Sequence, residues 1–120
     1  MAATTTFVNA LLNAAFAGGT YTGGVITMKL FTGNLPSAGG TEVTGGGYAA
    51  QTLSFGAASN KKIQTNTTLT FTNMPTSQTV AAYGIYSGVT LIDEKTLDVP
   101  FTADVNVNTL TVSYSFEIGT

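Results

Sequence analysis

The sequence predicts an all-β protein, an antiparallel β-sandwich of jelly-roll type with a short N-terminal helix. From Val25 to the C-terminal region, apolar and polar residues alternate with the period of two that half-buried strands show. Turn residues divide this region into about seven or eight short segments at near-regular spacing, as in sandwiches and barrels. Thr makes up about a fifth of the chain, and its β-branched side chain favours strands.

The first segment, residues 5–17, is predicted to be the helix. The run Thr4–Thr6 can supply a hydroxyl N-cap, and Gly18-Gly19 can end the helix because glycine adopts the left-handed C-terminal conformation. Asn9 and Asn13 fall on one face and the apolar residues on another. We expect this helix to lie over one end of a sheet; an arm that docks on a partner is the alternative. The apolar face consists of Phe7, Leu11, Leu12, Ala15 and Phe16.

The strands follow in order from about residue 25 to about residue 117. In the first, Ile26, Met28 and Leu30 form one face. In the last, the apolar face is Leu110, Val112, Tyr114 and Phe116, and in the second the apolar pair is Leu53 and Phe55. The expected strands cover residues 25–31, 48–55, 67–72, 80–87, 89–92, 97–101 and 110–117.

Three features refine this order. The loop over residues 33–47 is too long for a tight hairpin, and loops of this length are usually functional or mobile. Gly84, inside a strand, indicates a bulge or a close backbone approach. Pro100 favours an edge strand or a strand end, because it has no N–H to donate to a neighbour.

Length and composition indicate one domain that is partly covered by partners. The 120 residues fit a single domain over 1–120, and no second domain, repeat or linker is visible. Charged residues are 8% of the chain, against about 25% in a typical soluble domain. The chain therefore lacks the charged surface that keeps monomers apart. We expect hydroxyl and amide groups to solvate part of the surface and partners to cover the rest.

The composition argues against several classes of function. The chain has no His, Cys, Arg or Trp, and the first three serve most enzymes in proton transfer, nucleophilic attack and anion clamping. We expect no enzyme, no catalytic residue and no cofactor. A net charge of −2 gives no electrostatic footprint for nucleic acid. No apolar run approaches the ~20 residues of a membrane span, and the N-terminus lacks the basic start of a signal peptide.

The densest set of charges is Asp93, Glu94, Asp98 and Asp104. Neighbouring carboxylates can hold Ca²⁺ or act as the acid and nucleophile of a glycosidase. Their spacing matches no EF-hand loop, and Lys95 offers an ordinary surface partner. We interpret the cluster as a solvated turn and expect no metal site.

The tyrosines suggest either an interface or a sugar-stacking platform. Tyr83 and Tyr86 lie three residues apart, on opposite faces of a strand, so at least one should be buried. The other is a reasonable interface anchor, since aromatic rings contribute much contact area. We favour core or interface roles over carbohydrate binding. The predicted partner contacts are Phe7, Leu11, Tyr48, Tyr83 and Tyr86. The predicted contact elements are the helix, the loop over 33–47 and the strand over 80–87.

One block resembles a signature of small tailed-bacteriophage virion proteins. It reads GGGYAAQ at residues 45–51 and FGAAS at residues 55–59. The helix, the YGIY strand at 83–86 and the LTVS strand at 110–113 extend the resemblance over about residues 7–116. Two departures stand out: Ala50 occupies a position that is often Arg in relatives, and the strand around Ala82 lacks a His that relatives often carry.

The resemblance implies a structural protein of the virion, made in the host cytoplasm. We expect a capsid cement protein on the head surface that binds across subunits of the major capsid protein, and itself forms a homodimer or homotrimer. Binding only the assembled shell would stabilise the mature head by mass action. The alternative is a tail-fibre or tail-tip module that adheres to the host surface. A third hypothesis is a secreted carbohydrate-binding or hydrolytic domain.

Overall fold

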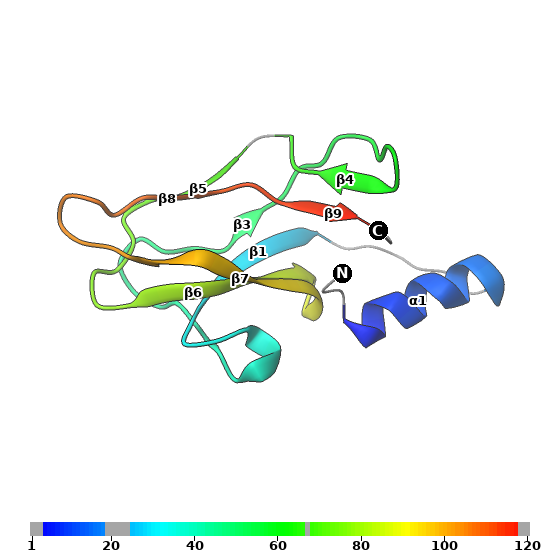
Figure 1. The fold of residues 1–120 in the computed structure, drawn as a ribbon, viewed down its shortest axis with the longest axis horizontal. Coiled ribbons are helices and arrows are strands. Elements are labelled where there is room, and N and C mark those ends of the chain that lie inside the picture. The colour runs from blue at the N-terminus through cyan, green and yellow to red at the C-terminus, as the bar shows by residue number, and fades with distance from the viewer. Residues whose placement is uncertain (1–3, 19–24, 67, 118–120) are drawn as a thin grey trace.

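Two layers of antiparallel strands form the body of the protein, and one helix projects from its end (Figure 1). The computed structural model describes residues 4–18, 25–66 and 68–117. In Figure 1 the layer of β4, β9, β5 and β8 lies above the layer of β1, β6 and β7, and the helix α1 (Thr5–Phe16) extends to the right. The predicted all-β antiparallel sandwich with a short N-terminal helix is confirmed.

The larger sheet has the strand order β2-β1-β6-β7, and β3 also pairs with β1. Its centre consists of β1 (Ile26–Thr32), which pairs along its whole length with β6 (Thr79–Ser87). On the far side of β6 lies the edge strand β7 (Thr90–Thr102), and on the far side of β1 lie the short strands β2 (Thr41–Glu42) and β3 (Gln51–Thr52).

Two pairs of short strands make the second layer. β4 (Lys62–Gln64) pairs with β9 (Ser115–Glu117), and β5 (Leu69–Phe71) pairs with β8 (Leu110–Val112). The core lies between the layers, because alternate residues of each strand point inward. The largest fully buried side chains are Phe71, Met28, Leu30, Ile85, Val43 and Val80.

A tyrosine side chain occupies the gap between the two short strands at the outer edge of β1. β2 pairs with Phe31 and Thr32, and β3 pairs with Thr27 and Met28. Between them, the Leu30 N–H donates to the Tyr48 hydroxyl at 3.0 Å. The predicted strand over residues 48–55 is therefore mostly wrong: only Gln51–Thr52 forms β3, because the chain before it turns the ring of Tyr48 inward.

The loop over residues 33–47 is more ordered than the sequence predicted. It contains a 3-10 turn, η1 (Pro36–Ala38), and the strand β2, and Val43 is buried in the core. Gly84 of β6 allows η1 to approach, because a Cβ there would lie 3.0 Å from Cγ of Pro36. The close atoms at Gly84 belong to side chains, Pro36 among them, and not to a backbone segment as the sequence suggested.

The two strands predicted over 89–92 and 97–101 are one strand, β7. Thr96 pairs with Ala82 and Phe101 with Val80, so residues 97–100 bulge out opposite a single residue of β6. Pro100 lies in this bulge of an edge strand, where its missing N–H leaves no bond unmade. The edge position predicted from Pro100 is confirmed.

The last predicted strand is divided into β8 and β9, which pair with different partners. Its inward face is as predicted: Val112 and Tyr114 are buried, and Leu110 and Phe116 pack against the core. The predicted strand over 67–72 forms β5, whose Leu69 and Phe71 are buried; Thr67 lies outside the described residues.

Candidate interaction surface

The helix α1 is attached to the body at its first turn. The N–H of Thr4 donates to the carbonyl of Ile92 at 3.0 Å, and its hydroxyl donates to the carbonyl of Leu91 at 2.7 Å. The same hydroxyl accepts from the N–H of Phe7 at 3.3 Å and so caps the helix, as predicted. Thr4 thus joins the start of α1 to the start of β7. No helix in the described ranges has the length and apolarity that a membrane crossing requires.

The apolar surface of α1 is divided between two sides, which corrects the single face predicted from sequence. Phe7 packs against the core and Leu11 is half-buried, as expected. Leu12 is 50% exposed and Phe16 is 85% exposed. Phe16 follows Phe7 by nine residues, about two and a half turns, and therefore lies on the opposite side of the helix. Gly18 follows the helix with a φ of 71°, as expected for a C-terminal glycine; Gly19 lies outside the described residues.

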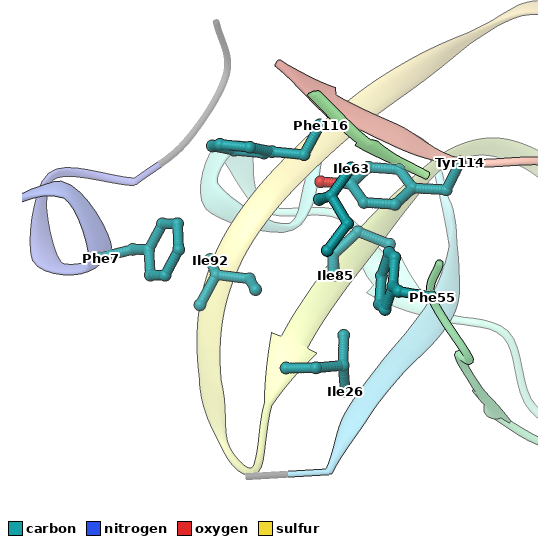
Figure 2. A pocket seen from close by; sticks show the side chains of 8 residues that line it. All are labelled: Phe7, Ile26, Phe55, Ile63, Ile85, Ile92, Tyr114 and Phe116. Carbon is teal, nitrogen blue, oxygen red and sulfur yellow. The ribbon is translucent and has the colours of Figure 1, made fainter. Parts of the chain in front are cut away.

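A wholly apolar pocket lies between the layers beside α1 (Figure 2). Its volume is about 200 Å³. Phe7 of α1 and Phe116 of β9 form its outer side, with ring centroids 5.9 Å apart in an edge-to-face arrangement. The helix therefore contributes a wall to this pocket. The lining residues are Phe7, Ile26, Phe55, Ile63, Ile85, Ile92, Tyr114 and Phe116.

One carboxylate is buried behind this pocket. The hydroxyl of Tyr114 donates to Oδ2 of Asp93 at 2.5 Å, and Asp93 is only 8% exposed. Burial, and then the hydrogen bond to Asp93, raise the pKa of Tyr114 well above its ordinary value. The interpretation of Asp93 as part of a solvated turn is therefore wrong. A bulge that the sequence does not reveal explains this burial. Ile85 pairs with Asp93 and Tyr86 with Leu91, so Ile92 is the extra residue, and Ile92 and Asp93 are both buried.

The other three acidic residues have separate roles. Glu94 accepts hydrogen bonds from the backbone N–H of Ser37, at 3.0 Å, and from its hydroxyl, which ties η1 to β7. Oδ1 of Asp104 accepts from the N–H groups of residues 106 and 107, which lowers the pKa of its carboxyl. Asp98 is exposed in the β7 bulge. Among the described residues, no three acidic side chains come together as metal ligands would.

Of the tyrosines predicted to contact a partner, two belong mainly to the interior. Tyr83 is 5% exposed and packs edge-to-face on Tyr114; burial raises its pKa to about 12. Tyr48 is half-buried, stacks on Phe71 and donates to Oε2 of Glu42 at 2.8 Å; burial raises its pKa also. Tyr21 lies outside the described residues.

Tyr86 lies on the opposite face of β6 from Tyr83, as predicted. It is half-buried, stacks on Phe31 and lies beneath Nζ of Lys29, 4.6 Å from its ring centroid. Burial raises its pKa. The predicted partner contacts are untested at all five positions; Phe7, Leu11, Tyr48 and Tyr86 retain some exposed surface for them.

Exposed large apolar side chains lie at the α1 end of the molecule, where the sequence did not predict them as a group. Besides Leu12 and Phe16, these are Val25 and Val89. Gly88 donates to the carbonyl of Val25 at 3.2 Å, which places Val25 beside the β6–β7 turn that carries Val89. We call Leu12, Phe16, Val25 and Val89 the apolar end. The connection from β7 to β8, orange in Figure 1, lies at the opposite end and exposes Val105 and Val107.

Comparison with known proteins identifies one similar family. The family model described as "Podophage GP4 fiber I protein gp80" matches residues 2–112, a range that includes α1, the pocket-lining residues up to β8 and all four residues of the apolar end. No curated protein and no solved structure matches the chain.

Proposed function

This chain belongs to the family of the podophage GP4 fiber I protein gp80 and is a phage virion structural protein, and from that membership we propose that it is a structural subunit of the virion fiber. It is built into the particle through its apolar end. No reaction is part of this role: the buried Tyr114–Asp93 pair stabilises the core.

The observation that carries the proposal is the distribution of apolar surface. Phe16 is 85% exposed and Val89 is 95% exposed, at the same end of the molecule as a wholly apolar pocket. Exposed apolar side chains gathered at one end of a molecule are candidates for a protein interaction site. The α1 segment within it carries no charged residue, so a neighbour can cover it without desolvating a charge.

Capsid cement is the second candidate function. The charged fraction of 8% favours it, because a nearly neutral surface can lie across subunit boundaries of a shell without burying unpaired charges. The major capsid protein would then be the partner. The family description names a fiber protein, and we therefore rank the fiber role first.

Location on the particle separates these two functions. Gold-labelled antibodies against the isolated chain are applied to intact virions and viewed by electron microscopy. The fiber role predicts that the label lies on fibers and is absent from heads. It also predicts few copies of the chain per particle, as counted by quantitative mass spectrometry. Label spread over the heads, with copy numbers comparable to those of the major capsid protein, would overturn the fiber role in favour of cement.

A further inference from the structure

The apolar pocket beside α1 has walls that cannot easily move together to close it. Four of the five isoleucines of the chain line it, one each from β1, β4, β6 and β7; they are Ile26, Ile63, Ile85 and Ile92. Isoleucine is stiff at χ1 because its Cβ is branched, and pairing within the two layers fixes the four strands. Figure 2 shows these side chains arranged around one common space. The pocket is therefore preformed.

The inner end of the pocket is held by the hydrogen bond between Tyr114 and Asp93. The Tyr114 ring lines the pocket, and its hydroxyl donates to Oδ2 of Asp93. The same ring packs edge-to-face on Tyr83 and Phe55, with ring centroids 6.1 Å and 6.3 Å away. Its hydroxyl is the only polar side-chain atom among the lining residues, and Asp93 accepts its proton. The lining thus offers an occupant a rigid apolar wall.

Water is a poor occupant of such a pocket. A buried water typically makes about three hydrogen bonds, and the lining cannot supply them. An empty pocket is also unfavourable, because its lining loses the dispersion contacts of a packed interior. An apolar cavity of about 150 Å³ lined by similar side chains stays dry and binds benzene, and the volume here is about 200 Å³. An apolar solute is therefore the favoured occupant.

Size and chemistry together define the class of ligand. Pockets for drug-sized molecules begin at about 300 Å³, so a volume of about 200 Å³ suits a single aromatic ring or a short branched alkyl group. Sugars and peptides are disfavoured, because their hydroxyl or amide groups would be buried without partners. A charged molecule would lose its hydration with no compensating charge in the lining.

We propose that this pocket binds a compact, uncharged apolar molecule about the size of one aromatic ring. The molecule lies between the buried residues Ile85, Ile92 and Tyr114 at the inner end and the half-buried rings of Phe7 and Phe116 at the outer side. A free molecule fits better than a side chain of a neighbouring subunit. Such a side chain would bring its own backbone N–H and C=O groups against the two phenylalanine rings, which do not satisfy them.

Occupancy of the pocket also stabilises the position of α1. The helix has 12 residues, none of them buried, and it supplies Phe7 to the wall of the pocket. A bound molecule therefore adds contacts between this helix and the two layers. The site shares no residue with the apolar end, so it is independent of the fiber role.

Benzene is the probe, and isoleucine methyl groups provide the readout. The isolated protein, isotope-labelled at its isoleucine and valine methyl groups, is titrated with benzene and followed by NMR. We expect saturable shifts at the four lining isoleucines, while Val105 and Val107, exposed at the opposite end of the molecule, keep their positions. Isoleucine signals that do not shift, or valine signals that shift equally, would overturn the proposal.

Pyridine is the matched control ligand, because it has the shape of benzene and a ring nitrogen that the lining would leave unpaired. It should bind about tenfold or more weakly than benzene. Equal affinities would contradict a wholly apolar site. This comparison uses the native chain, so it does not depend on the folding of any variant.

Two pairs of variants place the site. Ile63→Trp puts an indole into the pocket and should abolish benzene binding, whereas the volume-conserving Ile63→Leu should retain it. Phe7→Ala removes the wall that α1 supplies and should weaken binding several-fold. Phe101→Ala should not, because this half-buried phenylalanine packs on the core outside the pocket. Native affinity in folded Ile63→Trp would overturn the proposed site, and native affinity in Phe7→Ala would overturn the part assigned to α1.

Discussion

The hydroxyl of Tyr114 donates a hydrogen bond of 2.5 Å to the carboxylate of Asp93 in the interior of the sandwich. This contact joins the two layers, since Asp93 belongs to β7 and Tyr114 lies between β8 and β9. A buried carboxylate that loses its donor keeps the full penalty of desolvation. The pair therefore holds the layers in register behind the apolar pocket.

Tyr114→Phe is expected to destabilise the protein by about 1–3 kcal/mol, because it leaves a buried oxygen of Asp93 without its donor. The measurement is the free energy of unfolding from urea titrations. Asp93→Asn, which retains hydrogen-bonding atoms at this position, should have the smaller effect. If Tyr114→Phe and wild type unfold at the same urea concentration, the pair does not contribute as described.

Alkaline pH is expected to destabilise the fold. Burial raises the pKa of Tyr83 from 10.0 to about 12, and the pKa of Tyr114 is raised as well. The folded state thus holds protons that the unfolded state releases, so this contribution is complete below pH 10 and is lost as the pH rises from 10 towards 12. Urea titrations across this range should show falling stability, with a shallower fall in Tyr114→Phe. Constant stability up to pH 12 would contradict the burial of these phenols.

Tyr48→Phe should cost about 1–3 kcal/mol, because the N–H of the fully buried Leu30 loses the hydroxyl that pairs with it. The ring and its stack on Phe71 are retained. Hydrogen exchange provides the specific readout: the Leu30 amide should lose protection more than its neighbours in β1. Unchanged protection would mean that another group satisfies this edge of the sheet.

Gly84→Ala tests the approach of η1 to the larger sheet. The added Cβ would lie 2.9 Å from Cε1 of Tyr86, 3.0 Å from Cγ of Pro36 and 3.1 Å from Cδ1 of Leu91. Overpacking of this kind typically costs about 1–3 kcal/mol. Thermal unfolding should show a lower melting temperature than in Gly56→Ala, where the added Cβ would lie 3.2 Å from the side-chain oxygen of the exposed Asn66. Equal melting temperatures would show that η1 can move away from the added methyl group without a measurable loss of stability.

Much of the fold follows from local pattern. The alternation around Met28 and Phe71 predicts β1 and β5, because each has one face in the core. Thr4 is recognisable as a cap, since its hydroxyl precedes an apolar run. Each of these features depends only on residues that are close together in the sequence, so it can be predicted without knowledge of the tertiary structure.

The rest depends on contacts between distant segments. Asp93 is buried because a bulge in the β6–β7 pairing shifts the inward face by one residue, and no local pattern marks that bulge. Tyr48 does not form part of the predicted strand, because its hydroxyl accepts a hydrogen bond from the N–H of Leu30 at the edge of β1. The side of α1 that meets the body was also unpredictable, because large apolar residues span about half of its circumference, from Phe7 and Leu11 to Leu12 and Phe16.

Thiol protection in the assembled particle tests the central claim, that the apolar end is the surface covered in the virion. Phe16→Cys and Val105→Cys place single thiols at opposite ends of the molecule, both exposed in the isolated chain. Each is treated with a maleimide as dilute protein and as assembled virions. We predict that Phe16→Cys loses its reactivity on assembly while Val105→Cys keeps it. Equal reactivity of Phe16→Cys in both states would contradict the account.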